Sequence, residues 1–483
     1  MIKAIVLKLK ASNWLPSIFK HSGWYLLASL STKALGFILL PIYTQYLTTA
    51  DYGILTSIEV INYLLPFFFS FTLVTAFDRF YHQKVRQANY LSHLFSSIFW
   101  FVLLLGGIVV TLIILSSYFW MPHFLGVPAY PYSILGFAPI LLTELSLLGF
   151  AFFRQSLQAK KISLILISSA LINIGISLYL VVGLEMGVIG KLWGNLGAAI
   201  FSFLAILGYV WKKGLIQFVI HKKLLKECLA YSVPLMPLVA SNWINIFSDR
   251  LLIGKYENMD AVGIYSIAFH ISMILYFVGE SIVQVIVPIS MKGLETNKGA
   301  TKDKLGDYTF YLWTFLLVGC LFACLFSKPI IAYFLNPSFL ATHTVIPILC
   351  LAIVFQMIHR LYGQVIKFYK KTKIFTIGAI GSSCLNILLN LIFIPKYGYI
   401  AAAYTTLTVS ILYALFIVWQ SNKIELIDTP YSKYFLSTLI FLFLIVFPNT
   451  GSISFIWRIL LFSGVSGILF YMLANHFNRF KFR

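Results

Sequence analysis

The sequence predicts an all-α integral membrane protein with about 14 transmembrane helices, arranged as two parallel six-helix lobes followed by two further helices. Three observations predict this fold class. Long apolar runs recur at the length of a membrane span, lysine and arginine gather between alternate runs, and the second half of the chain repeats the first. Of the 483 residues, 60% are hydrophobic and 11% are charged, which excludes an ordinary soluble domain.

Each apolar run is close to the roughly 20 residues that a helix needs to cross the hydrocarbon core of a bilayer. A run of this length with few charges is typical of a transmembrane helix. We therefore predict spans at residues 23–47, 52–77, 90–117, 130–153, 162–183, 187–211, 229–254, 261–290, 307–327, 345–366, 374–394, 398–420, 434–447 and 454–474.

Lysine and arginine are unequally divided between the two sides that these spans define. Of the 36 basic residues, 28 fall in segments of one side, and only Lys255, Lys328 and Lys396 fall in loops of the other. The positive-inside rule makes the first side cytoplasmic and predicts that both termini lie there. The net charge of +21 then reflects loops beside anionic membrane lipids, so it does not indicate nucleic acid as a partner.

An internal repeat organises the chain. The segment YLTTADYGIL, from Tyr46, joins the first two spans, and DRLLIGKYENMDAVGIYSIA, from Asp249, joins the seventh and eighth. A repeat of six spans returns the chain to its starting side, so both copies have the same orientation and are related by a pseudo-twofold axis along the membrane normal. Four residue pairs align the copies: Asp51 with Asp260, Gly53 with Gly263, Asn173 with Asn386, and Gly187 with Gly398.

The repeat predicts three parts of the chain. Residues 1–220 form the N-lobe, 221–423 form the C-lobe, and 424–483 form two extra helices. The basic and partly amphipathic segment 212–228 is predicted as an interfacial helix that links the lobes.

Charged residues inside the spans are the candidates for function. A charge at the centre of a membrane helix costs about 2.5–3.5 kcal/mol on insertion scales, so most such residues must face protein or a water-filled cavity. Lys33 lies near the middle of the first span and has the strongest claim to a place in a lumen. Arg250, Arg360 and Lys191 lie nearer the ends of their spans, where snorkelling to the interface is the alternative.

Acidic residues accompany these bases. Glu59 and Glu280 occupy matching spans of the two lobes, and each could bind a coupling cation or hold a lumen base in place. Asp249 precedes Arg250, but adjacent helical residues point about 100° apart, so we expect the two to serve different partners. The sequence thus predicts a basic cleft of Lys33, Arg250, Arg360 and Lys191, with lumen acids Glu59, Asp249 and Glu280.

Several chemical signatures are absent from the sequence. It has no GxxxxGK[ST] phosphate loop, no HExxH and no paired Cys–His framework, and its five cysteines lack zinc or redox spacing. We therefore expect no catalytic residues, no metal site and no cofactor, apart from a possible coupling ion, H⁺ or Na⁺.

Five segments resemble a known family: LPIYTQYLTTADYGIL, FDRFYHQ, YSVPLMP, SDRLLIGKYENMDAVGIYSIA and NLIFIPKYGYIAAA. Together they are similar to polysaccharide flippases of the multidrug/oligosaccharidyl-lipid/polysaccharide exporter superfamily. The resemblance implies alternating access by two lobes in a bacterial inner membrane. The implied substrate is a polyprenyl-pyrophosphate-linked oligosaccharide, such as an O-antigen or a capsular or exopolysaccharide repeat unit, moved from the cytoplasmic to the outer leaflet.

The resemblance also implies a basic cleft that receives the pyrophosphate, and other glycan-assembly membrane proteins as possible partners. Lys33, Arg250 and Arg360 fit such a cleft by position. Two alternatives remain. A drug/cation antiporter of the same superfamily would need an anionic aromatic cavity, whereas a membrane glycan polymerase or ligase would need a substantial outer loop with catalytic residues.

Overall fold

The computed structural model describes residues 24, 34–83, 89–296, 298–427, 432, 434, 437–438 and 454–481. Within these ranges the regular secondary structure is entirely helical. Lys33, the first of the predicted cleft bases, lies outside the described residues, as does most of the predicted span 434–447.

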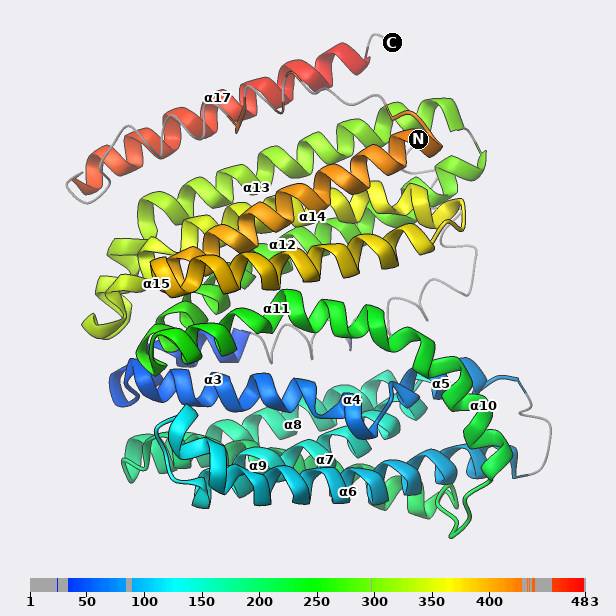
Figure 1. Ribbon diagram of the computed structural model, residues 1–483. Helices are drawn as coiled ribbons and strands as arrows, with labels where there is room; N and C mark the ends of the chain where they lie inside the picture. Colours follow the sequence, from blue (N-terminus) through cyan, green and yellow to red (C-terminus); the bar gives the residue numbers. More distant parts are fainter. Residues whose placement is uncertain are drawn as a thin grey trace. The chain divides into compact units, whose positions relative to one another are not determined.

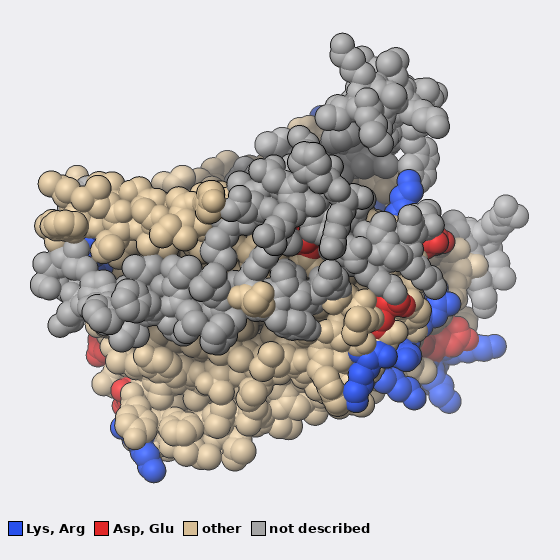
Figure 2. Space-filling model, turned by 90° about the horizontal axis from the view of Figure 1, so that it is seen from above, with Lys and Arg blue, Asp and Glu red and all other residues tan. Residues whose placement is uncertain are grey.

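The described helices confirm an all-α, multi-pass membrane protein. Ten of them are long and apolar enough to cross a membrane, and two shorter apolar helices are Ala34–Tyr46 and Ile456–Tyr471. One of the ten, residues 373–424, contains both of the predicted spans 374–394 and 398–420. On the face drawn in Figure 2, charged side chains gather at the ends and a broad band of other residues separates them, as expected for helices that cross hydrocarbon.

The chain divides into two compact units, Met1–Ala240 and Ser241–Arg483, which we call unit 1 and unit 2. In unit 1, α9 packs against α7 and α8, while α6 packs against α7 (Figure 1). The labelled helices of unit 1 are α3 (Thr49–Leu64), α4 (Pro66–Phe69), α5 (Leu73–Phe80), α6 (Tyr90–Phe124), α7 (Ala129–Gln155), α8 (Ala159–Leu178), η1 (Tyr179–Gly183), α9 (Gly187–Lys212), α10 (Lys222–Ser232) and η2 (Val233–Leu235).

In unit 2, α14 is the central helix, since it packs against α12, α13 and α15. The terminal helix α17 packs against α13. The helices are α11 (Met236–Tyr256), which begins at the end of unit 1, α12 (Met259–Thr296), α13 (Lys298–Phe334), η3 (Pro337–Thr344), α14 (Ile346–Phe368), α15 (Lys373–Ile424) and α17 (Phe455–Lys481).

The repeated sequence segments start equivalent helices. Before α3, the Thr48 side chain accepts a hydrogen bond from Asp51 N, and Asp51 Oδ2 accepts one from Thr48 N, which is a capping box. Before α12, Asn258 Oδ1 accepts from Ala261 N at 2.9 Å. Both copies therefore satisfy backbone N–H groups that the first turn of a helix leaves without intrahelical partners.

The second predicted span, 52–77, is wrong as one continuous helix. It is broken between α4 and α5, where Phe71 and Thr72 have left-handed φ angles of 47° and 56°. Pro66 precedes the break and cannot donate a backbone hydrogen bond. The Thr72 hydroxyl donates to Ser232 O at 3.1 Å, so the break is tied to α10. Hydropathy detects the apolar run but carries no signal for this long-range contact.

The predicted interfacial helix 212–228 is also wrong in part. Helix α9 ends at Lys212, Gly214 has a φ of 64°, and helix resumes only at Lys222. The connecting backbone is bonded to α6 instead, because Gln217 N donates to Ser96 Oγ and His221 N donates to Ser97 Oγ, each at 2.8 Å. These bonds replace those that a continuous helix would have made.

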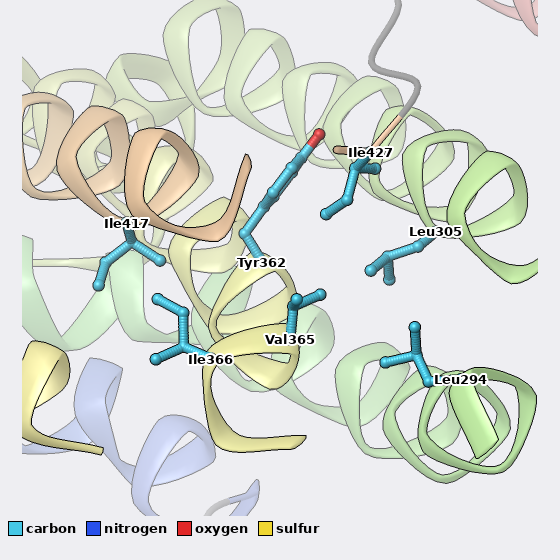
Figure 3. Packing of buried hydrophobic residues seen from close by; sticks show 7 residues of the cluster. All are labelled: Leu294, Leu305, Tyr362, Val365, Ile366, Ile417 and Ile427. Atoms are coloured by element: carbon cyan, nitrogen blue, oxygen red, sulfur yellow. The ribbon is translucent and has the colours of Figure 1, made fainter. Parts of the chain in front are cut away.

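One buried apolar cluster joins helix ends in unit 2. The side chains gather around the C-terminal part of α14 and come also from the end of α12, the start of α13 and the end of α15 (Figure 3). These helix ends are the ones that the basic loops predict to be cytoplasmic. The cluster consists of Leu294, Leu305, Tyr362, Val365, Ile366, Ile417 and Ile427.

Candidate functional site

Lys191 is the charged centre of a polar cluster in unit 1. It lies in the second turn of α9, and its Nζ donates to Asn173 Oδ1 on α8 at 3.1 Å. The same Nζ lies 4.5 Å from the centroid of the Tyr43 ring. Asn173 Nδ2 donates in turn to Asn195 Oδ1 at 2.8 Å. The hydrogen-bond acceptor and the aromatic ring that contact this ammonium group are therefore both neutral.

Two further side chains complete the Lys191 cluster. Tyr43 and Ser177 share a hydrogen bond of 2.5 Å between their hydroxyl oxygens, which joins the helix Ala34–Tyr46 to α8. Glu59, on α3, is half-buried and attracts Lys191 electrostatically. The structure thus brings two sequence-predicted residues, Lys191 and Glu59, to the same region of unit 1.

A groove of about 610 Å³ runs along α7, α8 and α9 of unit 1. Asn173 and Asn195 of the Lys191 cluster line it toward one end, and Arg154 lines it at the other. Arg154 Nη2 is held by Asp78 Oδ2 at 2.6 Å. The rest of the described lining includes both apolar side chains and side chains with hydroxyl groups.

Asp249 is the centre of a second polar cluster, in unit 2. The residue is 2% exposed. Its Oδ2 accepts from the Tyr265 hydroxyl at 2.6 Å and from Thr406 Oγ1 at 3.0 Å, while its Oδ1 accepts from Asn390 Nδ2 at 2.6 Å. Three donors therefore satisfy a carboxylate that would be costly to bury alone.

Two more residues of α15 extend the Asp249 cluster. Asn390 Oδ1 accepts from the Thr405 hydroxyl, and Asn386 Oδ1 accepts from Asn390 Nδ2 at 3.1 Å. Ser248, beside Asp249 on α11, also donates to Asn386 Oδ1, at 3.2 Å. The cluster is a compact set of carboxylate, amide and hydroxyl oxygens, which are the ligand types that hard cations prefer.

Arg250 lies next to Asp249 in sequence, and its guanidinium lies 5.4 Å from the centroid of the Tyr265 ring, whose hydroxyl donates to Asp249. Arg250 is 2% exposed, it donates to Ile246 O, and its guanidinium lies 4.1 Å from the centroid of the Phe269 ring. Arg250 is therefore packed inside unit 2 against α12.

Arg360 and Glu280 form an ion pair between α14 and α12. Arg360 Nη2 lies 2.9 Å from Glu280 Oε1, and Arg360 Nη1 donates to the Tyr276 hydroxyl at 2.6 Å. The Arg360 side chain is 37% exposed and that of Glu280 is 20% exposed. Of the two roles considered for Glu280, this geometry matches that of holding a base in place.

Sequence reasoning overlooked the amide and hydroxyl side chains that bind the charged groups. Asn195, Asn390, Thr405 and Thr406 were not among the predicted site residues, although each lies in an apolar span. A usable signal existed, because Asn173 and Asn386 align in the repeat and the structure places one in each cluster. Among the described residues, no group of three His, Cys, Asp or Glu side chains could hold a metal ion.

The long apolar helices and the polar clusters between them define a polytopic membrane protein. The chain matches the family described as "Polysaccharide biosynthesis protein" over residues 18–294, more than half its length, and it belongs to this family. Over 214 residues it is 26% identical to the uncharacterized membrane protein MJ1068 of Methanocaldococcus jannaschii. That match covers 43% of this chain, which spans only 41% of this curated relative.

Solved structures share the fold. The lipid II flippase MurJ, in an inward closed conformation, is similar with a TM-score of 0.71 and 18% identity, over 94% of this chain and 99% of that one. An inward-facing multidrug resistance MATE family transporter of the MOP superfamily is similar with a TM-score of 0.64 and 12% identity, over 83% of this chain and 95% of that one. At these identities the likeness shows the fold alone.

Proposed function

We propose that the protein is a flippase that moves a polyprenyl-pyrophosphate-linked oligosaccharide from the cytoplasmic to the outer leaflet of a bacterial inner membrane. The observation that carries this proposal is Lys191, a membrane-depth ammonium whose hydrogen bond and ring contact are to neutral groups. Such a group can attract the anionic pyrophosphate of a lipid carrier. Membership of the polysaccharide biosynthesis family supports a glycan as the cargo.

The physical problem of the transfer matches these features. A sugar head group loses its hydrogen bonds to water in hydrocarbon, whereas its lipid tail is already stable there. Polar groups inside the protein replace the lost bonds. An inside-negative membrane potential favours outward movement of an anion by about 2.3 kcal/mol per charge per 100 mV. O-antigen and capsular or exopolysaccharide repeat units belong to this substrate class.

Asp249 is the proposed site of ion coupling, with H⁺ or Na⁺ as the ion. Protonation of a buried carboxylate changes the hydrogen bonds that it can accept, so it would loosen the links from α11 to Tyr265, Asn390 and Thr406. The oxygens of Asp249, Asn386 and Thr405 also fit a small hard cation, provided that the Asn390 amide turns its oxygen inward. Transport measured against Na⁺ at fixed pH, and against pH without Na⁺, distinguishes the two ions.

The antiporter alternative requires an anionic cavity for organic cations. In the described part of unit 1 the groove has no acidic lining residue, and in unit 2 Glu280 is paired with Arg360. These observations favour an anionic or neutral cargo over a cationic one.

Deletion and complementation in a glycan-producing host test the proposal. Loss of the protein should strand lipid-linked repeat units on the cytoplasmic leaflet, and the wild-type chain should restore export. Lys33→Glu, at a position outside the described residues, should abolish export, while Lys33→Arg should retain more because a positive charge remains. Normal export by well-expressed Lys33→Glu and Lys191→Glu variants would contradict a pyrophosphate-binding role for these bases.

A further inference from the structure

We propose that the groove along α7, α8 and α9 of unit 1 binds the hydroxyl-rich sugar portion of the cargo. We call it the amide groove, because amide side chains line it toward one end. This inference rests on the proposed flippase function and assigns the sugar to a place distinct from the pyrophosphate. Half of the lining residues that the structure describes are polar: Asn62, Thr143, Ser146, Arg154, Ser169, Asn173, Asn195 and Ser202.

The dimensions of the amide groove suit a head group of more than one sugar ring. Its volume of about 610 Å³ lies within the roughly 300–1,000 Å³ range of small-molecule sites. Along α7 the lining extends from Pro139 to Arg154, which is about 22 Å at a rise of 1.5 Å per residue. The groove is therefore elongated along the helices.

The hydrogen-bonding pattern of the groove identifies the ligand class. The hydroxyls of Thr143, Ser146 and Ser169 donate to backbone carbonyls at 2.9, 2.7 and 3.1 Å, respectively. A hydroxyl has one proton and two acceptor lone pairs, so these three side chains can only accept further bonds. Sugar hydroxyls can donate to them. A phosphate cannot, because it has no proton to give when fully ionised.

A hydrogen-bond donor lies at the end of the groove that is opposite Arg154. Asn195 is exposed and its Oδ1 accepts from Asn173, while within the described residues its Nδ2 has no hydrogen-bond partner. Nδ2 can therefore donate to a sugar oxygen. Acceptors along the groove and a donor at its end match a compound that both donates and accepts, as a polyol does.

Charge excludes the other ligand classes. Among the described residues that line the groove, Arg154 is the sole charged side chain, and Asp78 neutralises it. An organic cation would find no carboxylate there. Lipid tails would leave the polar groups without partners, at a cost in free energy for each. Apolar groups such as Phe150 and Leu147 can cover the C–H faces of a sugar ring.

Direct binding to the full chain in lipid nanodiscs tests the proposal. The probes are polyprenyl pyrophosphate bearing one N-acetylhexosamine and the same lipid without sugar. Ala198→Phe fills the groove, and Thr143→Val removes an acceptor hydroxyl from its lining without touching the Lys191 cluster. Each should weaken binding of the sugar-bearing lipid about tenfold and leave binding of the sugar-free lipid unchanged. Ile200→Phe is the matched control, since Ile200 is 40% exposed on the same helix but does not line the groove.

The outcomes separate this inference from the function on which it rests. If the wild-type chain binds both lipids equally, or if the two groove variants bind the sugar-bearing lipid as the wild type does, the amide groove is not the sugar site although the flippase function stands. If binding of both lipids weakens together in the folded Thr143→Val variant, the groove binds the pyrophosphate and the assignment is overturned. If the wild-type chain binds neither lipid, the proposed function fails and the groove assignment fails with it.

Discussion

The Lys191 cluster of unit 1 and the Asp249 cluster of unit 2 are built on the same repeat, but a basic residue is the centre of the first and an acidic residue is the centre of the second. Asn173 aligns with Asn386, and with the same spacing Ser177 aligns with Asn390; all four belong to the clusters. The charged positions do not align in this way. Lys191 corresponds to Ala402, and Asp249 corresponds to Leu40.

This comparison shows which features of the repeat the two units have in common. Both units keep amides and hydroxyls on the fifth helix of the repeat, where they can bind either a cation or an anion partner. The central charged residue comes from a neighbouring helix, which is α9 in unit 1 and α11 in unit 2. A duplicated scaffold can thus hold a basic residue in one copy and an acidic residue in the other, and removing the two residues should have different consequences.

Replacing Asp249 should have the largest effect. Asp249→Leu gives unit 2 the residue that unit 1 has at the aligned position, but it removes one hydrogen bond each from Tyr265, Asn390 and Thr406. Each lost bond to a buried donor costs about 1–3 kcal/mol, so we expect about 3 kcal/mol or more of destabilisation. Thermal unfolding of the purified protein measures it. Asp249→Asn should keep most of the stability while losing ion-dependent transport, and an equally stable Asp249→Leu variant would contradict the network.

Replacing Lys191 should mainly affect transport. Lys191→Met removes the charge and keeps a long side chain, and the groups left behind, Asn173 and Tyr43, retain other partners. We expect export to fall at least about tenfold, which corresponds to about 1.4 kcal/mol, with a smaller change in unfolding temperature. Lys255→Met is a suitable control, because Lys255 is exposed and does not belong to either polar cluster. Equal export by the Lys191→Met and Lys255→Met variants would show that export does not require the charge of Lys191.

Two aligned glycines sharpen the comparison at the level of the backbone. Gly187 and Gly398 have φ angles of 53° and 67°, so alanine is strained at both positions, at roughly 1 kcal/mol. A Cβ at Gly187 would meet open space, whereas one at Gly398 would lie 2.7 Å from Glu257 Cδ. Glu257 accepts a hydrogen bond from Tyr399 N at 2.9 Å, which Gly398→Ala would disturb. Unfolding measurements should therefore show that Gly398→Ala lowers the free energy of unfolding by about 1 kcal/mol more than Gly187→Ala does.

The smallest effect should come from the partly exposed ion pair. Glu280→Gln removes its charge, but Arg360 keeps its bond to the Tyr276 hydroxyl. Since Arg360 is 37% exposed, solvent screening limits the expected loss to about 1 kcal/mol or less. A double-mutant cycle with Arg360→Gln measures the coupling between the two side chains. A coupling free energy of several kcal/mol would mean that the pair is buried in the working protein.

The extent of successful prediction differed between fold and site. Apolar runs give the spans because every backbone group in a bilayer must be bonded within its own helix, so local sequence is enough. The break at Phe71 and Thr72 escaped prediction because it depends on a contact with Ser232, far along the chain. The charged site residues could be predicted from the sequence, because a charge in hydrocarbon has a high free-energy cost. Their neutral partners could not be predicted in this way, because Asn and Thr are common in membrane helices.

The sequence by itself determined that the chain crosses the membrane many times and that its halves repeat, because hydrophobic length and the repeat motifs are local properties. Tertiary structure alone decided which charges meet. It paired Arg360 with Glu280, placed the Arg250 guanidinium against the Phe269 ring and gave Lys191 the amide of Asn173. Such pairings depend on helix rotation and on contacts between residues as far as 80 positions apart in the chain, which hydropathy does not encode.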